Sequence, residues 1–582
     1  MESFKRSPNG RWSLSLSRAS LNTAIFVMEI GLENRIHTYS GGLGVLAGDM
    51  AYSFADLGYP ATFVTLLSRN GYTLQKLDSS AGQLDSPDPW SWKELLSPTE
   101  AKATMEIWGR PQTVGAWEYK IKGKTETSVL FLDVNYPEND RVVREATERL
   151  YGGETSDRLT QDIILGIGGY RVLKALGREV DMYHLNESHA ALATIELLRD
   201  AGGAEAARRK CAFTTHTPVA AGNDVFHVET VEGALKGYSW INWKEESSDG
   251  VVNLSRLASK YSGVTNAVSM KHSLVAERVI GHNHVTHVTN GAYHKRWVCP
   301  ELKKLYDKHL QGWENTPSLL GGAVGLPSEA LSNAHAAAKR SLVSMVNLHS
   351  PGHFDESILT ICVAKRFTGY KRNGMLLGDL ERLQRIAEEK GNLQIVFAGK
   401  THPRDASAKG MLADILRKAN LLNRGMRKAR AVVLENYDID MAKMLVAGAD
   451  VWLNNPRRPL EACGTSGIKA AMNGVLNLSV YDGWWLEGGI DGVNGWGVGR
   501  RPDWSDLSES VEGEDEAGLY SKLSSSVLPT FYQDRERWVD MQKRSIATIG
   551  ALFNSYRMVE EYVTKVYARA QAAGTPAVYS RP

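Results

Sequence analysis

The stretch at residues 451–469 reads VWLNNPRRPLEACGTSGIK, an apolar strand pattern followed by a polar turn and the start of a helical pattern. Units in which a strand precedes a helix build parallel sheets, and ligands bind beyond the carboxyl ends of such strands. Gly464, Thr465 and Ser466 open the predicted helix, where free N–H groups and hydroxyls can hold a phosphate. Lys469 lies just inside it, although the residues alone also allow an ordinary surface lysine. The stretch predicts an α/β fold with an anion site at this turn.

The same alternation continues on both sides of this stretch. In the second half, apolar runs predict strands at Leu359–Ala364, Gln394–Ala398, Ala431–Leu434, Val451–Leu453 and Leu476–Val480. In the first half they predict strands at Ala24–Met28, Ala61–Leu67, Val129–Val134, Met182–Leu185, Ala212–Thr215 and Val285–Thr289. Helical patterns lie between them, at Asp162–Ala175, Ala190–Asp200, Gly374–Lys390 and Ser407–Asn420. Two such halves predict two Rossmann-like domains that face a cleft.

The domain boundary is expected where the alternation restarts, between about Gly325 and Asp355. We therefore assign residues 1–335 and 336–540 to the two domains, and residues 541–582 to a C-terminal helix. Residues 534–573 read as one long helix with an apolar stripe of Met558, Val559, Tyr562, Val566 and Tyr567. Residues 76–106 are rich in Ser, Asp and Pro, and predict an irregular insertion or a β-rich excursion.

Composition excludes several classes of protein. The 582 residues carry 68 basic and 66 acidic side chains, and a net charge of +2 gives no strong field for nucleic acid or anionic membranes. Residues 1–20 lack the apolar core of a signal peptide, and no apolar run reaches the ~18 residues of a membrane helix. The four cysteines have no metal-ligand spacing, and no zinc or P-loop motif occurs, so no metal site is predicted. We expect a cytoplasmic protein.

Two further stretches can bind anions. Lys365–Arg372 reads KRFTGYKR directly after a predicted strand, and its four cations can hold phosphate oxygens, although a solvated basic loop is the alternative. Thr38–Gly44 reads TYSGGLG, in which Gly41 and Gly42 let a ligand approach the backbone, although a plain tight turn is the alternative. A phosphate cradle beside Lys469 is what pyridoxal phosphate (PLP) needs, since the phosphate anchors it and the amine bonds to it.

Polar residues also follow two strands of the first half. Asn186, Glu187 and His189 follow one strand and His216 follows the next, so we expect all four to line the cleft and to hydrogen-bond a polar ligand. A lone histidine is more often structural, but two such clusters are harder to dismiss. Two carboxylates at a suitable separation would also support a glycosidase, for which Glu187, Glu435 and Glu461 are candidates.

In these motifs the chain resembles the α-glucan phosphorylase family, which comprises the glycogen, starch and maltodextrin phosphorylases, and above all its compact bacterial and archaeal forms. The resemblance runs in order from about Ala24 to Trp496 and implies the two-domain glycosyltransferase B-type fold, whose last helix crosses back onto the first domain. Its motifs are MEIGL at 28–32, YSGGLG at 39–44, NESH at 186–189, THTP at 215–218, TNG at 289–291, residues 365–372, GK at 399–400, ENY at 435–437, residues 457–469 and DGWW at 482–485.

The resemblance implies a role for each matching residue. PLP would be carried by Lys469, and its phosphate held by Lys365, Tyr437, Gly464, Thr465 and Ser466. The substrate phosphate would be held by Arg366 and Lys371 with the backbone at Gly41 and Gly42. The glucosyl unit would contact His216, Asn290, Glu461, Cys463 and Gly464, with Asn186, Glu187 and His189 as further polar groups on the sugar side.

The reaction implied by the resemblance is reversible, retaining phosphorolysis of the non-reducing end of an α-1,4-glucan. The partners are an α-glucan such as maltodextrin, inorganic phosphate and glucose 1-phosphate. The PLP phosphate would exchange a proton with the substrate phosphate, and the His216 carbonyl would stabilise positive charge on the sugar. Family members are commonly homodimers, so a homodimer is expected. The chain has no room for the N-terminal regulatory extension of animal phosphorylases, so allosteric control by phosphorylation or nucleotides is not expected.

Three positions depart from the family pattern. Cys463 stands where serine is usual, Asn223 where compact members commonly have histidine, and Tyr293 where histidine is more usual. We expect all three to touch the sugar side, and they motivate one alternative, a catalytically silent glucan-binding protein. The other alternative is a nucleotide-sugar-dependent glucan synthase of the same fold. Synthases have a lysine just before the double glycine, where this chain has Tyr39 and Ser40, and they lack a cofactor lysine at the position of Lys469.

Overall fold

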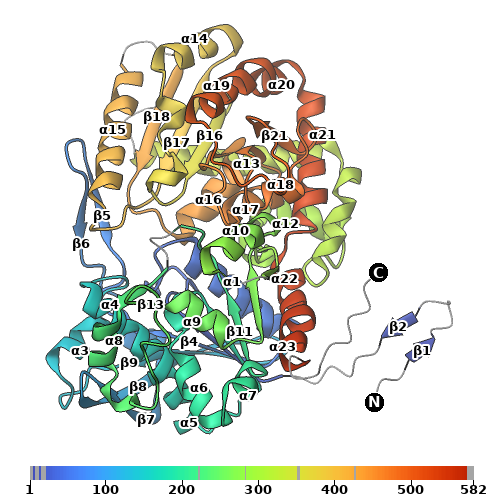
Figure 1. Ribbon diagram of the computed structural model, residues 1–582. Coiled ribbons are helices and arrows are strands. Elements are labelled where there is room, and N and C mark those ends of the chain that lie inside the picture. The colour runs from blue at the N-terminus through green and yellow to red at the C-terminus, as the bar shows by residue number, and fades with distance from the viewer. Residues whose placement is uncertain are drawn as a thin grey trace.

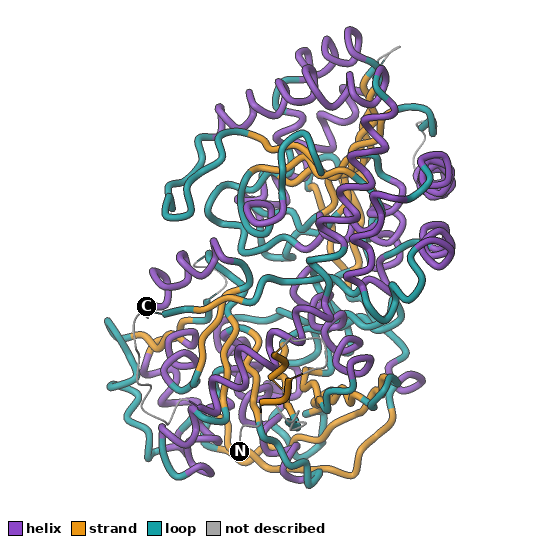
Figure 2. The backbone as a smooth tube through the Cα atoms, turned by 90° about the vertical axis from the view of Figure 1, so that its right-hand side faces the viewer, coloured by secondary structure: helices purple, strands orange, loops and turns teal. Residues whose placement is uncertain are grey.

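The computed structural model forms two lobes, each built on its own large sheet (Figure 1). It describes residues 4–6, 12–14, 21–219, 223–281, 284–349, 354–424 and 428–572, so most of the polar N-terminal segment and Pro351 lie outside the described part. In both lobes the strands lie inside and helices cover them (Figure 2). This arrangement confirms the prediction of an α/β chain with two Rossmann-like halves.

The first sheet has nine strands. The first of them along the chain is β3 (Thr23–Val27), whose five residues are all buried. Complete burial is expected of a parallel strand that helices cover on both faces. The strands are parallel from β15 to β9, and β8 and β7 add an antiparallel edge. In spatial order they are β15 (Thr286–His287), β14 (Val264–Ala267), β11 (Cys211–Thr214), β10 (Met182–Asn186), β3, β4 (Ala61–Leu66), β9 (Thr127–Asp133), β8 (Arg110–Ile121) and β7 (Ser97–Ile107).

The second sheet has six strands, all of them parallel. In spatial order they are β18 (Ala429–Leu434), β17 (Leu393–Ala398), β16 (Leu359–Ala364), β19 (Val451–Asn454), β20 (Leu476–Val480) and β21 (Gly495–Val498). The strand order reverses between β16 and β19. Ligands bind in the crevice that forms at such a reversal, outside the carboxyl ends of the strands. The loops after β16 and β19 are two of the three stretches in which the sequence predicts anion sites.

The helices follow the predicted alternation. On the first sheet lie α1 (Gly42–Leu57), α4 (Thr155–Ile163), α5 (Gly169–Ala175) and α6 (Ala193–Ala201), and α4 continues into α5 through one π-helical turn. On the second lie α14 (Leu380–Lys390), α15 (Ala406–Leu422), α16 (Ile439–Gly448), α17 (Thr465–Met472) and α19 (Glu512–Lys522). Helices α12 (Pro300–His309) and α13 (Ser328–His349) join the lobes, and α13 lies against α16. The predicted boundary at residues 335 and 336 falls inside α13 and stays a prediction.

The C-terminal segment is not the single long helix that the sequence predicts. It is divided into α21 (Arg535–Ser545), α22 (Ser555–Glu561) and α23 (Ala568–Ala572), with a break before Asn554. The Asn554 side chain accepts a hydrogen bond from the Arg557 N–H at 2.9 Å and so caps a new helix. Beyond the break the predicted apolar stripe packs with Ile25 and Val27 of β3, and α22 and α23 lie along the lower lobe (Figure 1).

Residues 74–107 form the β-rich excursion that the sequence predicts as one of two possibilities. The hairpin of β5 (Leu74–Asp78) and β6 (Gly82–Ser86) precedes the short α2 (Trp92–Leu95) and the edge strand β7. Among the described residues, the helices are all too short or too polar to cross a membrane.

Candidate active site

A cavity of about 910 Å³ lies where the carboxyl ends of the strands of the two sheets face each other. Residues that follow β3, β10 and β11 line one side, and residues that follow β16, β18 and β19 line the other. Fifteen of the seventeen predicted site residues line it: Gly41, Gly42, His189, His216, Asn290, Lys365, Arg366, Lys371, Tyr437, Glu461, Cys463, Gly464, Thr465, Ser466 and Lys469. The other two, Asn186 and Glu187, are buried and do not line the cavity.

The loop after β16 turns three of its four cations towards the cavity. Lys365 is buried and donates to Asn455 Oδ1 at 2.7 Å, and burial followed by repulsion from Lys371 holds its pKa well below the usual range. Lys371 donates to both carboxylate oxygens of Glu461, at 2.9 and 2.6 Å. Burial alone would lower the pKa of Lys371, but the Glu461 carboxylate outweighs it and raises that pKa. Arg366 is exposed to the cavity.

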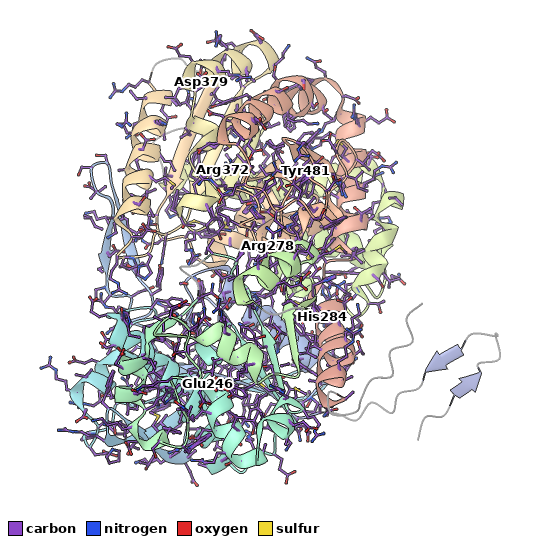
Figure 3. All side chains as sticks on the ribbon, viewed as in Figure 1. Glu246, Arg278, His284, Arg372, Asp379 and Tyr481 are labelled. Atoms are coloured by element: carbon purple, nitrogen blue, oxygen red, sulfur yellow. The ribbon has the colours of Figure 1, made fainter. Side chains whose placement is uncertain are left out.

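The prediction that all four cations of this loop form an anion site is wrong for Arg372, which is labelled in Figure 3. Its guanidinium donates to the carbonyls of Asn455 and Pro456, at 2.9 and 2.6 Å, and to Asp515 Oδ2 at 2.6 Å. The chain turns into the left-handed region at Arg372, with a φ of 46°, and this turn directs the side chain into the lobe. Arg372 therefore stabilises the loop and does not line the cavity.

Lys469 projects from α17 into the cavity and is nearly buried, with 6 % of its surface exposed. Its Nζ lies 4.1 Å from the centroid of the Trp297 ring. Burial lowers the pKa of the Lys469 ammonium to about 8. An amine with so low a pKa is partly neutral near physiological pH, as a nucleophilic lysine must be.

The start of α17 offers donors to an anion. Gly464 precedes the helix with a φ of +90°, which favours glycine there. The first N–H groups of the helix have no partner within it. Trp452 Nε1 donates to the Ser466 hydroxyl oxygen at 3.0 Å, so the Ser466 proton is free to point elsewhere. A phosphate beside Thr465 and Ser466 would meet both kinds of donor.

The glycine loop before α1 is held by Glu29, which follows β3. The buried Glu29 carboxylate accepts from the Ser40 N–H at 2.5 Å, the Gly41 N–H at 3.3 Å and the Tyr151 hydroxyl at 3.1 Å. Burial raises the pKa of Glu29. Because Glu29 already accepts from the Ser40 and Gly41 N–H groups, an anion here would bind to the N–H groups from Gly42 onward.

His216 lines the cavity, and the two predicted residues behind the wall support it. Its Nε2 lies 2.7 Å from Asn186 Oδ1, which can only accept, so the imidazole donates through Nε2–H. The Glu187 carboxylate accepts from the His216 N–H at 2.7 Å and the Thr217 hydroxyl at 3.0 Å. Burial lowers the pKa of the His216 imidazole to about 3, so the ring stays neutral. Asn186 and Glu187 are therefore placed to position His216 rather than to line the cleft as the sequence predicts.

A second ionic network adjoins the cavity. His189 forms a short contact with Asp224 through Nδ1, and Arg158 donates to Asp224 Oδ1 at 3.2 Å. Asp162, buried beside them, forms with His189 and Asp224 a group whose ligand atoms lie within 4.8 Å of one another, as in a metal site. The guanidinium of Arg158 already supplies positive charge there, and it lies 4.7 Å from the centroid of the Tyr151 ring.

Asn290 and Cys463, which the family pattern assigns to the sugar side, both line the cavity. Asn290 Oδ1 is buried without a hydrogen-bond partner among the described residues, so it can accept from a hydroxyl of a ligand. Asn223 also lines the cavity, and its Oδ1 accepts from Ser255 at 2.6 Å. Tyr293 does not line it, contrary to expectation: its hydroxyl donates to Asp56 at 2.7 Å, and its ring stacks on Tyr52 at 5.5 Å.

Several lining residues were not identified from the sequence as site residues. Glu29, Tyr151, Arg158 and Lys400 all line the cavity. Glu29 and Lys400 lie within quoted motifs and after strands, so strand-end position was a usable signal for both. Tyr151 and Arg158 follow no strand directly, and only the fold brings them to the cavity.

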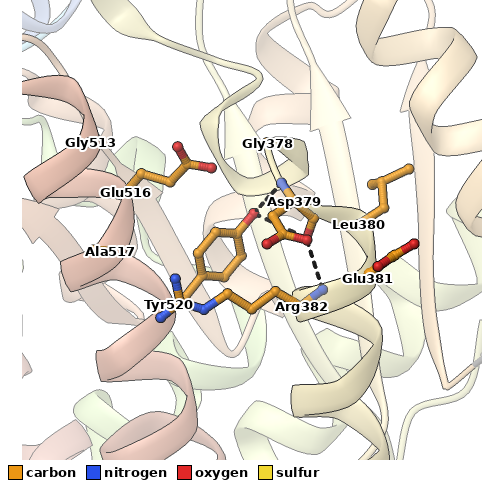
Figure 4. A pocket seen from close by; sticks show the side chains of 9 residues that line it. All are labelled: Gly378, Asp379, Leu380, Glu381, Arg382, Gly513, Glu516, Ala517 and Tyr520. Atoms are coloured by element: carbon orange, nitrogen blue, oxygen red, sulfur yellow. Dashed lines mark hydrogen bonds between the residues drawn. The ribbon is translucent and has the colours of Figure 1, made fainter.

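A second hollow, of about 540 Å³, opens at the far end of the second lobe (Figure 4). Two hydrogen bonds join residues that line it: the Asp379 N–H donates to the Tyr520 hydroxyl at 2.9 Å, and Asp379 Oδ1 accepts from the Arg382 N–H at 2.9 Å. It contains no predicted site residue. The interlobe cavity is therefore the candidate active site.

Comparison with known proteins agrees with this geometry. The family model described as carbohydrate phosphorylase matches residues 223–488. The maltodextrin phosphorylase of Thermococcus litoralis is 37 % identical over 94 % of this chain and 70 % of its own length. The chain belongs to the carbohydrate phosphorylase family. Two further family members are the glycogen phosphorylases of Aquifex aeolicus, 33 % identical over 93 % of this chain and 85 % of its own length, and of Mycobacterium tuberculosis, 32 % identical over 94 % and 71 %.

Proposed function

We propose that the protein is a PLP-dependent α-glucan phosphorylase, which transfers a glucosyl unit between the non-reducing end of an α-1,4-glucan and inorganic phosphate. The observation that carries the proposal is the convergence of Lys469, Lys365, Arg366 and Lys371 on one cavity beside the start of α17. Such a cavity has the charge to hold two phosphates at once. A glucan-binding protein has no need for that arrangement, and a nucleotide-sugar synthase has no need for the buried amine.

The residues present fit PLP. Lys469 offers a buried amine with a lowered pKa, and the Thr465 and Ser466 donors of α17 lie on the same cavity wall. Lys365 and Tyr437 line that wall as well. When bound, PLP supplies a phosphate group that can donate and accept a proton. The role of the chain is to anchor that group, to orient it and to keep it beside the substrate phosphate.

The second phosphate needs cations because like charges repel. Two unit charges 4 Å apart interact by about 4 kcal/mol at an effective dielectric constant of ~20. Arg366 faces the cavity without a hydrogen-bond or ion-pair partner among the described residues, so its charge is available to the substrate phosphate. Lys371 shares its charge with Glu461, so phosphate there competes with a carboxylate.

The sugar side of the proposal rests on groups that can pair with hydroxyls. Asn290 Oδ1 is an unpaired buried acceptor, and the neutral His216 ring is held in one orientation by Asn186. The Glu461 carboxylate adds an acceptor between the sugar side and Lys371. A glucosyl unit would satisfy these groups on binding, which is how polar sites select hydroxylated ligands.

The test is to incubate the purified protein with maltodextrin and inorganic phosphate, to assay glucose 1-phosphate, and to record the near-ultraviolet spectrum of the same sample. We expect both the product and a PLP chromophore. A PLP chromophore without glucose 1-phosphate would show that maltodextrin is not the substrate, and other glucans and disaccharides would be assayed next. If neither appears after PLP is added back, the proposal is wrong, and nucleotide-sugar donors become the substrates to test.

A further inference from the structure

The hairpin of β5 and β6 belongs by sequence to the first lobe but lies against the second (Figure 1). It is a two-stranded ribbon beside α15, and an isolated ribbon of that size is at best marginally stable in water. Two of its side chains, Gln75 and Gln83, are only 2 % and 1 % exposed, whereas Leu84 on the same hairpin is 48 % exposed. The hairpin thus buries amides and exposes a leucine, the reverse of ordinary patterning.

Gln75 forms a reciprocal pair with Asn436, which follows β18. The Gln75 N–H donates to Asn436 Oδ1 at 2.6 Å, and the Asn436 N–H donates to Gln75 Oε1 at 3.0 Å. Asn436 has a φ of 54°, in the left-handed region that asparagine adopts more readily than most residues other than glycine. The next residue, Tyr437, lines the active-site cavity. The left-handed turn that presents Tyr437 is therefore held from the other lobe.

Gln83 forms the same kind of pair with Thr401, which follows β17. The Thr401 N–H donates to Gln83 Oε1 at 2.9 Å, and Gln83 Nε2 donates to the Thr401 carbonyl at 3.2 Å. Lys400, one residue earlier, lines the cavity and donates through Nζ to the Thr73 carbonyl at 2.7 Å. At the tip of the hairpin, Gly82 approaches so closely that an added Cβ would lie 2.0 Å from the Lys409 carbonyl oxygen.

The two glutamines also bond to each other, since Gln75 Nε2 donates to Gln83 Oε1 at 2.8 Å and to the Gly399 carbonyl at 2.9 Å. Both glutamine amides thus have hydrogen-bond partners for their oxygen and their nitrogen, and a buried polar network of that kind specifies one arrangement of the parts that it joins. Removing one member leaves its buried partners unpaired. The loops after β17 and β18 are thus both fixed by two side chains of the opposite lobe.

We propose that residues 72–86 form an interlobe strap, and that Gln75 and Gln83 are positioning residues that hold the Lys400 and Tyr437 loops against the cavity. The strap itself stands on these hydrogen bonds alone. Its consequence for the active site rests on the proposed function, because Tyr437 is there expected to hold the PLP phosphate. The experiment therefore measures the loops and PLP binding separately.

The test compares Gln75→Leu and Gln83→Leu with Leu84→Ala, an exposed control on the same hairpin. Amide hydrogen exchange, followed by mass spectrometry in the full-length protein, reports on the two loops. We expect exchange at Thr401 and Asn436 to accelerate about tenfold or more in the glutamine variants, and not in the control. Exchange equal to that of the control in both loops would overturn the strap, whether or not the protein proves to be a phosphorylase.

The second measurement is the dissociation constant of PLP, from titration of the apoprotein in the near ultraviolet. We expect about a tenfold increase for Gln75→Leu. The Leu84→Ala control should keep the PLP affinity of the unchanged protein, because the Leu84 side chain is exposed. If the hairpin only stabilised the fold, Gln75→Leu would lower the urea midpoint and leave the PLP dissociation constant unchanged. An unchanged PLP affinity with accelerated exchange would overturn the positioning role and leave the function intact.

Discussion

Lys469 is the side chain on which the proposed chemistry depends most. We expect Lys469→Ala to abolish covalent attachment of PLP and to reduce kcat to background, since Lys469 is the lysine that α17 itself carries and it is nearly buried in the cavity. The far-ultraviolet circular dichroism should be unchanged, because the Lys469 ammonium makes no hydrogen bond within the described chain and its loss leaves no partner unpaired. Full activity in this variant would refute the mechanism.

The pKa of about 8 for Lys469 makes a second, independent prediction. Only the neutral amine attacks a carbonyl, so attachment of PLP should increase as the pH rises and level off above about 8. An ordinary lysine, with a pKa of ~10.4, would still be over ~99 % charged at pH 8. The measurement is the yield of PLP fixed to Lys469 by borohydride at saturating PLP from pH 6 to 10, read by mass spectrometry. A midpoint near 10 would contradict it.

Arg366 should act on phosphate rather than on glucan. Loss of a hydrogen bond to a charged group costs about 1.5–3 kcal/mol, so Arg366→Ala should raise the KM for phosphate by roughly ten- to a hundredfold. The KM for maltodextrin should change much less. Arg457→Ala is the matched control, because this guanidinium lies outside the cavity and pairs with Glu512 at 3.4 Å. Equal shifts in both Michaelis constants would argue against the assignment.

At the level of single elements, α17 depends on the turn at Gly464. A left-handed conformation costs residues with a Cβ about 1–2 kcal/mol, so Gly464→Ala should distort the start of α17 and weaken PLP binding roughly tenfold. Gly410→Ala is the matched control, because an added Cβ inside α15 meets no atom within 4 Å. That substitution should be neutral or stabilising. Spectral titration with PLP separates the two, and equal affinities would show that the turn is not needed.

The strands were predictable because they are short, apolar and buried, and β16 and β20 have the predicted bounds. The break before α22 was not predicted. Asn554 caps a new helix there, and α22 packs against the first sheet, a contact that the helical pattern alone does not reveal. The sequence predicted a cationic loop, but it could not tell which cations face the cavity, because Lys365 and Arg372 are both basic. The left-handed turn at Arg372 directs that side chain into the core of the lobe, and this turn is seen only in the structure. The expectation that Tyr293 touches the sugar side was wrong because its hydroxyl binds Asp56, a partner that lies far away in the sequence.

For the molecule as a whole, the residues predicted a cleft between two halves and the resemblance predicted the C-terminal crossing, but neither predicted the strap. The cleft could be predicted from the alternation of strands and helices, because each of these elements is recognised from a short stretch of sequence. The strap depends on pairs such as Gln83 with Thr401, which lie more than three hundred residues apart. Contacts between residues so far apart in the sequence form only in the folded chain, and for the same reason Tyr151 and Arg158 were not identified as site residues.

The C-terminal segment is the second connection between the lobes, and its contribution to stability can be measured. Met558 on α22 is fully buried against the first sheet, where its Sδ accepts from the Gly291 N–H at 3.3 Å. Truncation of a buried methionine costs about 2–5 kcal/mol, so Met558→Ala should move the urea midpoint to clearly lower concentration. Lys565→Ala, on the exposed side of the same segment, removes only an ion pair with Glu561 and should cost under about 1 kcal/mol. If the two midpoints coincide, α22 is docked too loosely to stabilise the first lobe; if only the Met558→Ala midpoint falls, the last helices are part of the core of that lobe.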